Sequence, residues 1–252
     1  MCKKNYIVLT ILFCFFFLPT LVFATSDDEY EIVSENTKYY KTITYYNNNA
    51  TLSVNNNSDN SETVEISKEE YDLAESNNVS INGTMTIETT YKRMTSYILT
   101  NGSYYRYKNR TVWKSIPSLR GYDIIAVGFL PSVKVHGNPV FLQEYCSGTS
   151  CHTSTASYMQ TFSMGAGATF KLASGTLSSL SVTFYFDVEK NTTATIIAQD
   201  AYSDYAHATS AVLLPTAMDY QVKGNAGIIL GSPASSYYDS ISVADATWSG
   251  SW

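Results

Sequence analysis

The chain has 252 residues, of which 44% are hydrophobic and only 15% are charged, and its formal net charge is −6. This apolar content excludes a wholly disordered chain, because enough apolar surface is present to form a buried core. The 21 tyrosines, together with many Thr, Ser and Val residues, favour strands over helices.

The first 24 residues have the pattern of a cleavable secretory signal peptide. Lys3 and Lys4 precede an apolar run of about a dozen residues, and a Val-Phe-Ala cleavage pattern ends at Ala24. The run is shorter than the roughly 20 residues that a membrane-spanning helix needs. We therefore expect cleavage after Ala24, a secreted, extracellular product and no transmembrane anchor.

Residues 25–60 are polar and rich in asparagine, with Asn runs at 47–49 and 55–57. We expect an acidic tail, linker or pro-segment here that is partly disordered, with a strand over 37–46 as the alternative. Residues 25–90 contain 13 acidic and 3 basic residues, whereas residues 91–252 contain 9 acidic and 11 basic ones. An acidic N-terminal segment thus precedes a nearly neutral body.

The stretch Ser67-Lys-Glu-Glu70 is a capping box, in which each of the two terminal side chains can satisfy the backbone amide of the other. It predicts one short helix from Lys68 to about Ser76. No other segment gives a comparable helical signal.

Two strand-like runs, 84–100 and 103–115, flank the dipeptide Asn101-Gly102, which is typical of a two-residue hairpin turn. Such a turn places Ile98 opposite Tyr105 on an apolar face. On the other face it places Arg93 opposite Arg110, and like charges in that position cost stability.

We therefore expect the second hairpin face to be solvated or neutralised by an anion. Tyrosines interleave with its basic side chains, a composition that suits an anionic cell-wall polymer or glycan. The alternatives are an ordinary solvent face and a face neutralised by the acidic N-terminal segment. The candidate ligand-binding residues are Arg93, Arg106, Lys108, Arg110, Tyr97 and Tyr104.

Short apolar or alternating runs continue to the C-terminus, and Gly, Pro, Ser and Asn separate them at the spacing of an all-β sandwich. We expect residues 61–252 to form one β-sandwich domain, jelly-roll-like in strand order. The runs are 122–129, 139–145, 158–162, 168–172, 177–188, 193–199, 207–213, 227–230 and 237–248.

Two of the four cysteines lie in the signal peptide, which leaves Cys146 and Cys151 in the mature chain. Outside the cell a remaining pair is expected to form a disulfide. The four residues between them do not fit the two-residue spacing of thioredoxin-like redox motifs, so a structural role is expected.

No catalytic, metal or cofactor motif stands out, and we expect no cofactor, no metal and no assigned catalytic residue. The histidines are His136, His152 and His207. In an extended chain Asp204 and His207 lie on opposite faces, so they cannot form a couple within one strand. There is no nucleophile elbow, and zinc and calcium ligand patterns are absent from the sequence.

The mature chain resembles, in style, exported proteins of low-GC Gram-positive bacteria. The features are the 12 Lys against 4 Arg of the whole sequence, the Asn runs, Tyr-Asp-Ile-Ile at 122–125 and the Tyr- and Trp-containing end at 238–252. The resemblance implies a bacterial source and no activity.

The leading hypothesis is a secreted, non-enzymatic binding or surface-interaction protein, with nucleic acid not expected as a partner. One alternative is a secreted hydrolase that uses His207 or a pair of carboxylates. The other is a membrane-active toxin or bacteriocin-like protein, because the stretch 172–188 is amphipathic and rich in Ser and Thr.

Overall fold

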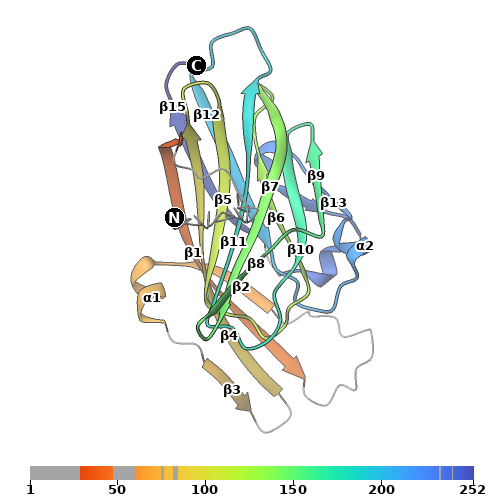
Figure 1. The fold of residues 1–252 in the computed structure, drawn as a ribbon. Coiled ribbons are helices and arrows are strands. Elements are labelled where there is room, and N and C mark those ends of the chain that lie inside the picture. The colour runs from red at the N-terminus through yellow and green to blue at the C-terminus, as the bar shows by residue number, and fades with distance from the viewer. Residues whose placement is uncertain (1–28, 48–60, 75–76, 82–84, 233, 240) are drawn as a thin grey trace, which may run out of the picture.

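A computed structural model describes residues 29–47, 61–74, 77–81, 85–232, 234–239 and 241–252. The expected signal peptide and its cleavage site at Ala24 lie outside the described residues. Strands dominate the described chain and form two antiparallel sheets packed face to face (Figure 1). The predicted all-β sandwich is therefore confirmed.

The larger sheet has eight strands in the order β2-β1-β4-β5-β11-β7-β8, with β3 paired to β4. Every pairing in it is antiparallel, and β11 enters the sheet between β5 and β7. Its strands are β1 (Glu31–Asn47), β2 (Ser61–Ile66), β3 (Asn77–Ile81), β4 (Met85–Thr100), β5 (Tyr105–Ser115), β7 (Val133–Ser147), β8 (Ser150–Ser154) and β11 (Ser179–Lys190).

The smaller sheet has five strands in the order β15-β12-β6-β10-β9. A two-stranded unit and short helices pack against it (Figure 1). The strands are β6 (Tyr122–Gly128), β9 (Tyr158–Phe162), β10 (Gly165–Lys171), β12 (Ala198–Ala206) and β15 (Ser242–Ser249); the covering unit comprises β13 (Tyr220–Val222), β14 (Ile228–Leu230), α2 (Leu214–Ala217), η2 (Gly224–Ala226) and η3 (Ala234–Tyr237).

The main core lies between the two sheets and contains Met94, Ile98 and Tyr107 of the larger sheet. A second core lies on the opposite face of the smaller sheet. Because β6 contributes to both cores, it reads as an almost continuous apolar run rather than an alternating one. The glycines Gly165 and Gly167 let Val222 and Tyr220 approach β10 so closely that an added Cβ would collide with them.

Part of the segment expected to be an acidic tail or linker forms a strand. Residues 31–47 form β1, which pairs with β4 along its whole length, so the strand alternative is correct and the tail or linker interpretation is wrong for this part. The inward side chains Tyr40, Thr42 and Thr44 are buried. Strand pairing along 16 positions of β4 outweighs the polar composition that favoured a tail.

The helix predicted from the capping box is present as α1 (Lys68–Leu73). The amide of Glu70 donates to the Ser67 side chain over 3.1 Å, as that pattern predicts. The helix ends earlier than expected, at Leu73. A second helix, α2, was not predicted, because its four residues carry no capping side chain.

The hairpin between β4 and β5 forms where expected, but the two-residue turn is wrong. The Asn101 side chain accepts hydrogen bonds from the amides of Ser103 (3.0 Å) and Tyr104 (2.9 Å), which closes a four-residue loop instead. The register therefore moves by two residues, and Arg93 lies opposite Val112, not opposite Arg110. A shift of two preserves the faces but removes the predicted clash of like charges.

Candidate functional site

The predicted basic residues of β5 lie on the outer face of the larger sheet, away from the core. Alternation along the strand turns Arg106, Lys108 and Arg110 outward, whereas Asn109 points inward and donates to backbone carbonyls of the smaller sheet. The structure does not bring the six candidate residues into one cluster. Arg106 lies in an ion pair inside the fold, Arg110 lines a groove, and the other four residues lie on the surface.

Arg106 belongs to a buried ion pair and is not available to a ligand. Its Nε lies 2.8 Å from Oδ1 of Asp187, and the Arg106 side chain is only 4% exposed. Tyr30 donates to the same carboxylate, and the guanidinium lies over the rings of Tyr30 and Tyr185. Burial, together with Asp187, raises the pKa of Tyr30 to about 12. This environment argues against the expected binding role of Arg106, because its charge already has a carboxylate partner inside the fold.

Asp187, from the middle of the body, supplies a carboxylate to Arg106. Tyr30, directly before β1, adds its ring to the guanidinium and donates its hydroxyl to the same carboxylate. The alternative in which the acidic N-terminal segment neutralises the basic face stays a prediction.

Of the other candidates, Arg93 is exposed, whereas Tyr97, Tyr104, Lys108 and Arg110 are half-buried. Lys108 lies over the ring of Tyr97 at 5.5 Å, and the two face each other across β4 and β5. Tyr104 stacks on His136 of β7, with ring centroids 4.2 Å apart. Arg93 is exposed on the outer face of β4.

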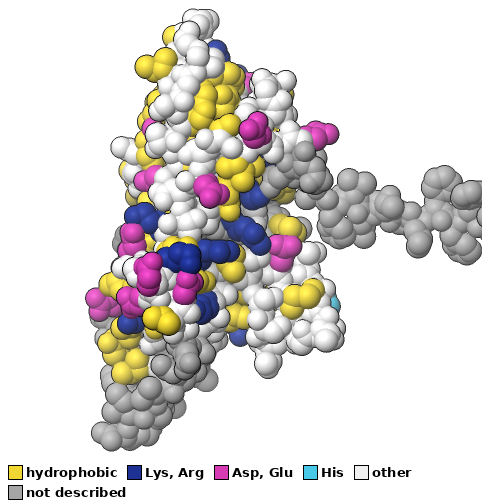
Figure 2. Space-filling model, turned by 90° about the vertical axis from the view of Figure 1, so that its left-hand side faces the viewer, with side chains coloured by type: hydrophobic (Ala, Val, Ile, Leu, Met, Phe, Trp, Pro, Cys, Tyr) yellow, Lys and Arg dark blue, Asp and Glu magenta, His cyan; other side chains and the backbone are white. Residues whose placement is uncertain are grey.

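Figure 2 shows one side of the molecule, on which Lys and Arg side chains lie directly beside Asp and Glu side chains. Contacts of this kind join Lys38 to Glu65 at 2.6 Å and Lys41 to Glu70 at 3.6 Å. The visible side therefore has mixed charge rather than one uniformly basic patch.

A groove lies where β5, β11, β7 and β8 meet, with a volume of about 840 Å³. Arg110 is the one predicted binding residue that lines it. Its opposite wall carries Glu144, whose carboxylate accepts a hydrogen bond from Ser181 at 3.3 Å. The other lining residues are Val112, Tyr145, Cys146, Cys151, His152, Thr153, Ser179, Leu180 and Ser181.

The predicted disulfide between Cys146 and Cys151 is present and forms part of the groove wall. The two cysteines are directly opposite each other in the β7–β8 hairpin, with Cα atoms 4.0 Å apart. Gly148, at φ +59°, allows the tight turn between the strands. The disulfide thus fixes the two short edge strands that form one end of the groove.

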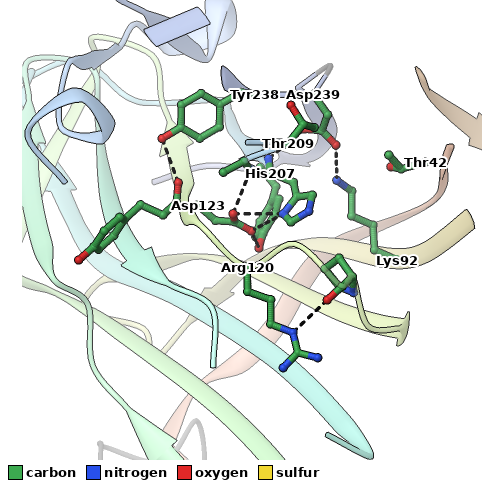
Figure 3. A network of polar contacts seen from close by, with 12 residues as sticks. Thr42, Lys92, Arg120, Asp123, His207, Thr209, Tyr238 and Asp239 are labelled. Atoms are coloured by element: carbon green, nitrogen blue, oxygen red, sulfur yellow. Dashed lines mark hydrogen bonds and ion pairs between the residues drawn. The ribbon is translucent and has the colours of Figure 1, made fainter. Parts of the chain in front are cut away.

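His207 does not lie in the groove but in a buried polar network (Figure 3). Its Nδ1 lies 2.9 Å from Oδ2 of Asp123, which also accepts from Tyr205 at 2.6 Å. Burial by itself lowers the pKa of His207, but the Asp123 carboxylate, with a smaller effect of Asp239, outweighs burial and raises it. The ring of Trp113 packs edge-on against the imidazole.

This arrangement argues against His207 as a catalytic base. The side chain is 4% exposed, Asp123 is fully buried, and neither residue lines the groove. As predicted, Asp204 and His207 point to opposite faces: Asp204 accepts from the amide of Ile228 in the covering unit. The hydrogen bonds of Asp123 hold β6 to the end of β12, a structural role.

The same network contains a second buried pair that sequence reasoning missed. Lys92 of β4 and Asp239, which follows η3, approach to 3.4 Å between Nζ and Oδ2, with side chains 1% and 0% exposed. The alternation of side chains along β4 could have indicated that Lys92 is buried, because it lies on the same inward face as Met94 and Ile98. The position of Asp239 beside it depends on tertiary contacts and has no sequence signal.

In the part of the chain that the structure describes, no three His, Cys, Asp or Glu side chains gather in a way that could hold a metal ion. Within these residues no helix has the length and apolar character needed to cross a membrane.

No family model matches this chain, and no curated protein matches it. Among solved structures, the crystal structure of the collagen binding domain of Erysipelothrix rhusiopathiae surface protein RspB is similar over 73% of this chain and 74% of that chain. The identity is 6% and the TM-score is 0.30. A likeness of this degree gives no information about the site.

Proposed function

We propose that the chain is an exported, non-enzymatic binding domain that recognises an anionic polymer of the cell surface, such as a phosphodiester polymer or an acidic glycan. The recognition surface is the outer face of the larger sheet, centred on the groove. The disulfide supports an oxidising, extracellular environment for such a protein.

The observation that carries this proposal is that Arg110 lines the groove without an ion-pair partner among the described residues. No acidic side chain in this part of the chain lies within 4 Å of its guanidinium group. The neighbouring Arg106, by contrast, is matched by Asp187. An arginine that borders a groove without an internal ion pair can give its planar donors to a phosphate or carboxylate of a ligand.

Two further basic side chains extend the surface. Lys108 is two residues from Arg110 on the same face of β5, and Arg93 lies diagonally across on β4, opposite Val112. An extended polymer could contact all three, with Tyr97 beside Lys108 offering its ring. Glu144 in the groove favours a ligand with spaced, rather than continuous, negative charge.

The test is binding of the secreted protein to a glycerol-phosphate polymer at low and physiological salt, by calorimetry or surface plasmon resonance. Arg110→Glu should weaken binding at least about tenfold, and added salt should weaken wild-type binding because it screens surface charge. Lys223→Glu, an exposed charge reversal in another part of the molecule, is the matched control. Absent wild-type binding, or equal loss in both variants, overturns the proposal.

The two alternative functions find less support. The hydrolase hypothesis needs an accessible His207, and the ring is enclosed. The toxin hypothesis rested on residues 172–188, most of whose strand-forming part is β11, a central strand paired on both sides within the larger sheet. Releasing that strand would require breaking both ladders.

A further inference from the structure

Lys92 and Asp239 form an unusual pair because both charged groups are removed from water. Figure 3 shows the Lys92 side chain directed at Asp239 inside the sandwich. Burying two charges is costly unless short, well-aligned hydrogen bonds compensate. The separation of 3.4 Å is long for a charge-assisted bond, which is usually about 2.7–2.9 Å.

The surroundings of the lysine amine are mostly aromatic. Its nitrogen lies 5.2 Å from the ring centre of Trp113 and 5.0 Å from that of Tyr205. Among the described residues, Asp239 is the only side chain to which Lys92 donates a hydrogen bond. The two rings attract the ammonium through their π faces, but an ammonium group has three N–H donors and only one hydrogen bond to a described side chain is present, so its hydrogen bonding stays incomplete.

The two oxygens of the Asp239 carboxylate are held in different ways. Oδ1 accepts the backbone N–H of His207 at 2.9 Å, whereas Oδ2 faces both Lys92 and the hydroxyl of Thr63, which donates at 3.0 Å. Thr63 is in turn hydrogen-bonded to Thr42. The carboxylate is therefore fixed with one oxygen on a backbone donor and the other toward the amine.

We propose that Lys92 and Asp239 condense to form an intramolecular isopeptide bond. One proton passes from the lysine ammonium to Oδ2, which gives a neutral amine that can act as a nucleophile and a neutral acid. The amine nitrogen then bonds to Cγ of Asp239. The Cγ–Oδ2 bond breaks, and Oδ2 leaves with two lysine protons as water, so the reaction needs no oxidant, reductant or added group.

The neighbouring groups fit this reaction. The His207 N–H stabilises negative charge on Oδ1 in the tetrahedral intermediate, and the Thr63 hydroxyl can donate to the departing Oδ2. The bonds from Asp123 to the His207 ring and to the amide of Ala208 hold that backbone donor in place. Asp123 and His207 are thus positioning residues for Asp239.

The bond would join parts of the fold that meet only in the folded state. Lys92 lies in the larger sheet and Asp239 just before the last strand of the smaller sheet, 147 positions later in the sequence. The link would connect the two layers of the sandwich and secure the attachment of β15.

The test is the intact mass of the denatured, purified wild-type protein. We expect the measured mass to be one water molecule below the mass calculated from the sequence of the purified protein, in addition to the two hydrogens lost in the disulfide. Lys92→Arg retains a positive charge but should lose this deficit, whereas Lys114→Arg, a change at an exposed lysine of β5, should retain it. Proteolysis should yield a joined peptide pair containing residues 92 and 239.

The proposal is overturned by a folded wild-type protein whose mass falls below the calculated value only by the two hydrogens of the disulfide. This outcome does not depend on how the variants fold. A mass deficit that persists in Lys92→Arg, or that maps to other residues, also overturns it. Asp239→Asn provides a further check, since an amide can form the same bond by releasing ammonia, whereas Asp239→Ala cannot.

Discussion

The ring Nδ1 of His207 and the carboxylate of Asp123 lie 2.9 Å apart where both side chains are buried, and this contact ties β6 to the end of β12. Asp123→Ala should lower the free energy of unfolding by about 3–5 kcal/mol, because it leaves the imidazole and the Tyr205 hydroxyl without their acceptor. Urea denaturation followed by tryptophan fluorescence measures the change. Glu62→Ala, at an exposed position of β2, should change stability by less than about 0.5 kcal/mol.

The free energy of unfolding should fall as the pH rises from about 4 to 8. Burial raises the pKa of Asp204 to about 7, so the folded protein keeps a proton that the unfolded chain releases. The raised pKa of His207 acts in the same direction, since its contribution is complete in acid and is lost as the folded group deprotonates. Urea midpoints at pH 5 and pH 8 measure the decline, which should be smaller in Asp204→Asn. Equal midpoints in the wild type contradict this expectation.

Removing Asp187 should destabilise the fold more than removing an exposed ion-pair partner. Asp187→Ala leaves Arg106 buried without its carboxylate, at a cost of about 3 kcal/mol. Lys134→Ala breaks an ion pair with Glu189 whose side chains are 53% and 37% exposed, and should cost about 0–1 kcal/mol. Thermal and chemical unfolding of the two variants can be compared directly, and similar losses would show that the Arg106 contact is not important for stability.

Replacing both Cys146 and Cys151 by serine should reduce the free energy of unfolding by about 2 kcal/mol, since the disulfide closes a loop of only a few residues. Polymer binding should weaken as well, because the β7–β8 hairpin forms one end of the groove. Circular dichroism should show the sheets retained. A variant with unchanged stability and binding would remove the disulfide from the proposed recognition surface.

Local patterns predicted much of this fold. The capping box located α1 because both partners are three residues apart, and the cysteine pair predicted the disulfide because its ends lie in one hairpin. The Asn-Gly signal located the β4–β5 hairpin but not its register. The Asn101 side chain forms turn hydrogen bonds that a dipeptide rule does not include.

The order of strands could not be predicted in the same way. β1 pairs with β4, and β11 lies between β5 and β7, so the pairings that place Asp187 on Arg106 join residues 81 positions apart. The same holds for Asp123 and His207, which are 84 positions apart. These contacts depend on which strands meet, and no local spacing encodes that choice.

The placement of β1 against the end of the chain has a consequence for synthesis. The hydroxyl of Ser34 donates to Thr247, and the amide of Asn36 to Asp245, across 213 and 209 positions. A chain that emerges N-terminus first therefore exposes the inward edge residues of β1 until its last strand arrives. Such long-range contacts slow folding and leave the incomplete sandwich open to aggregation, so a chaperone that shields β1 would be most useful before residue 242 is available.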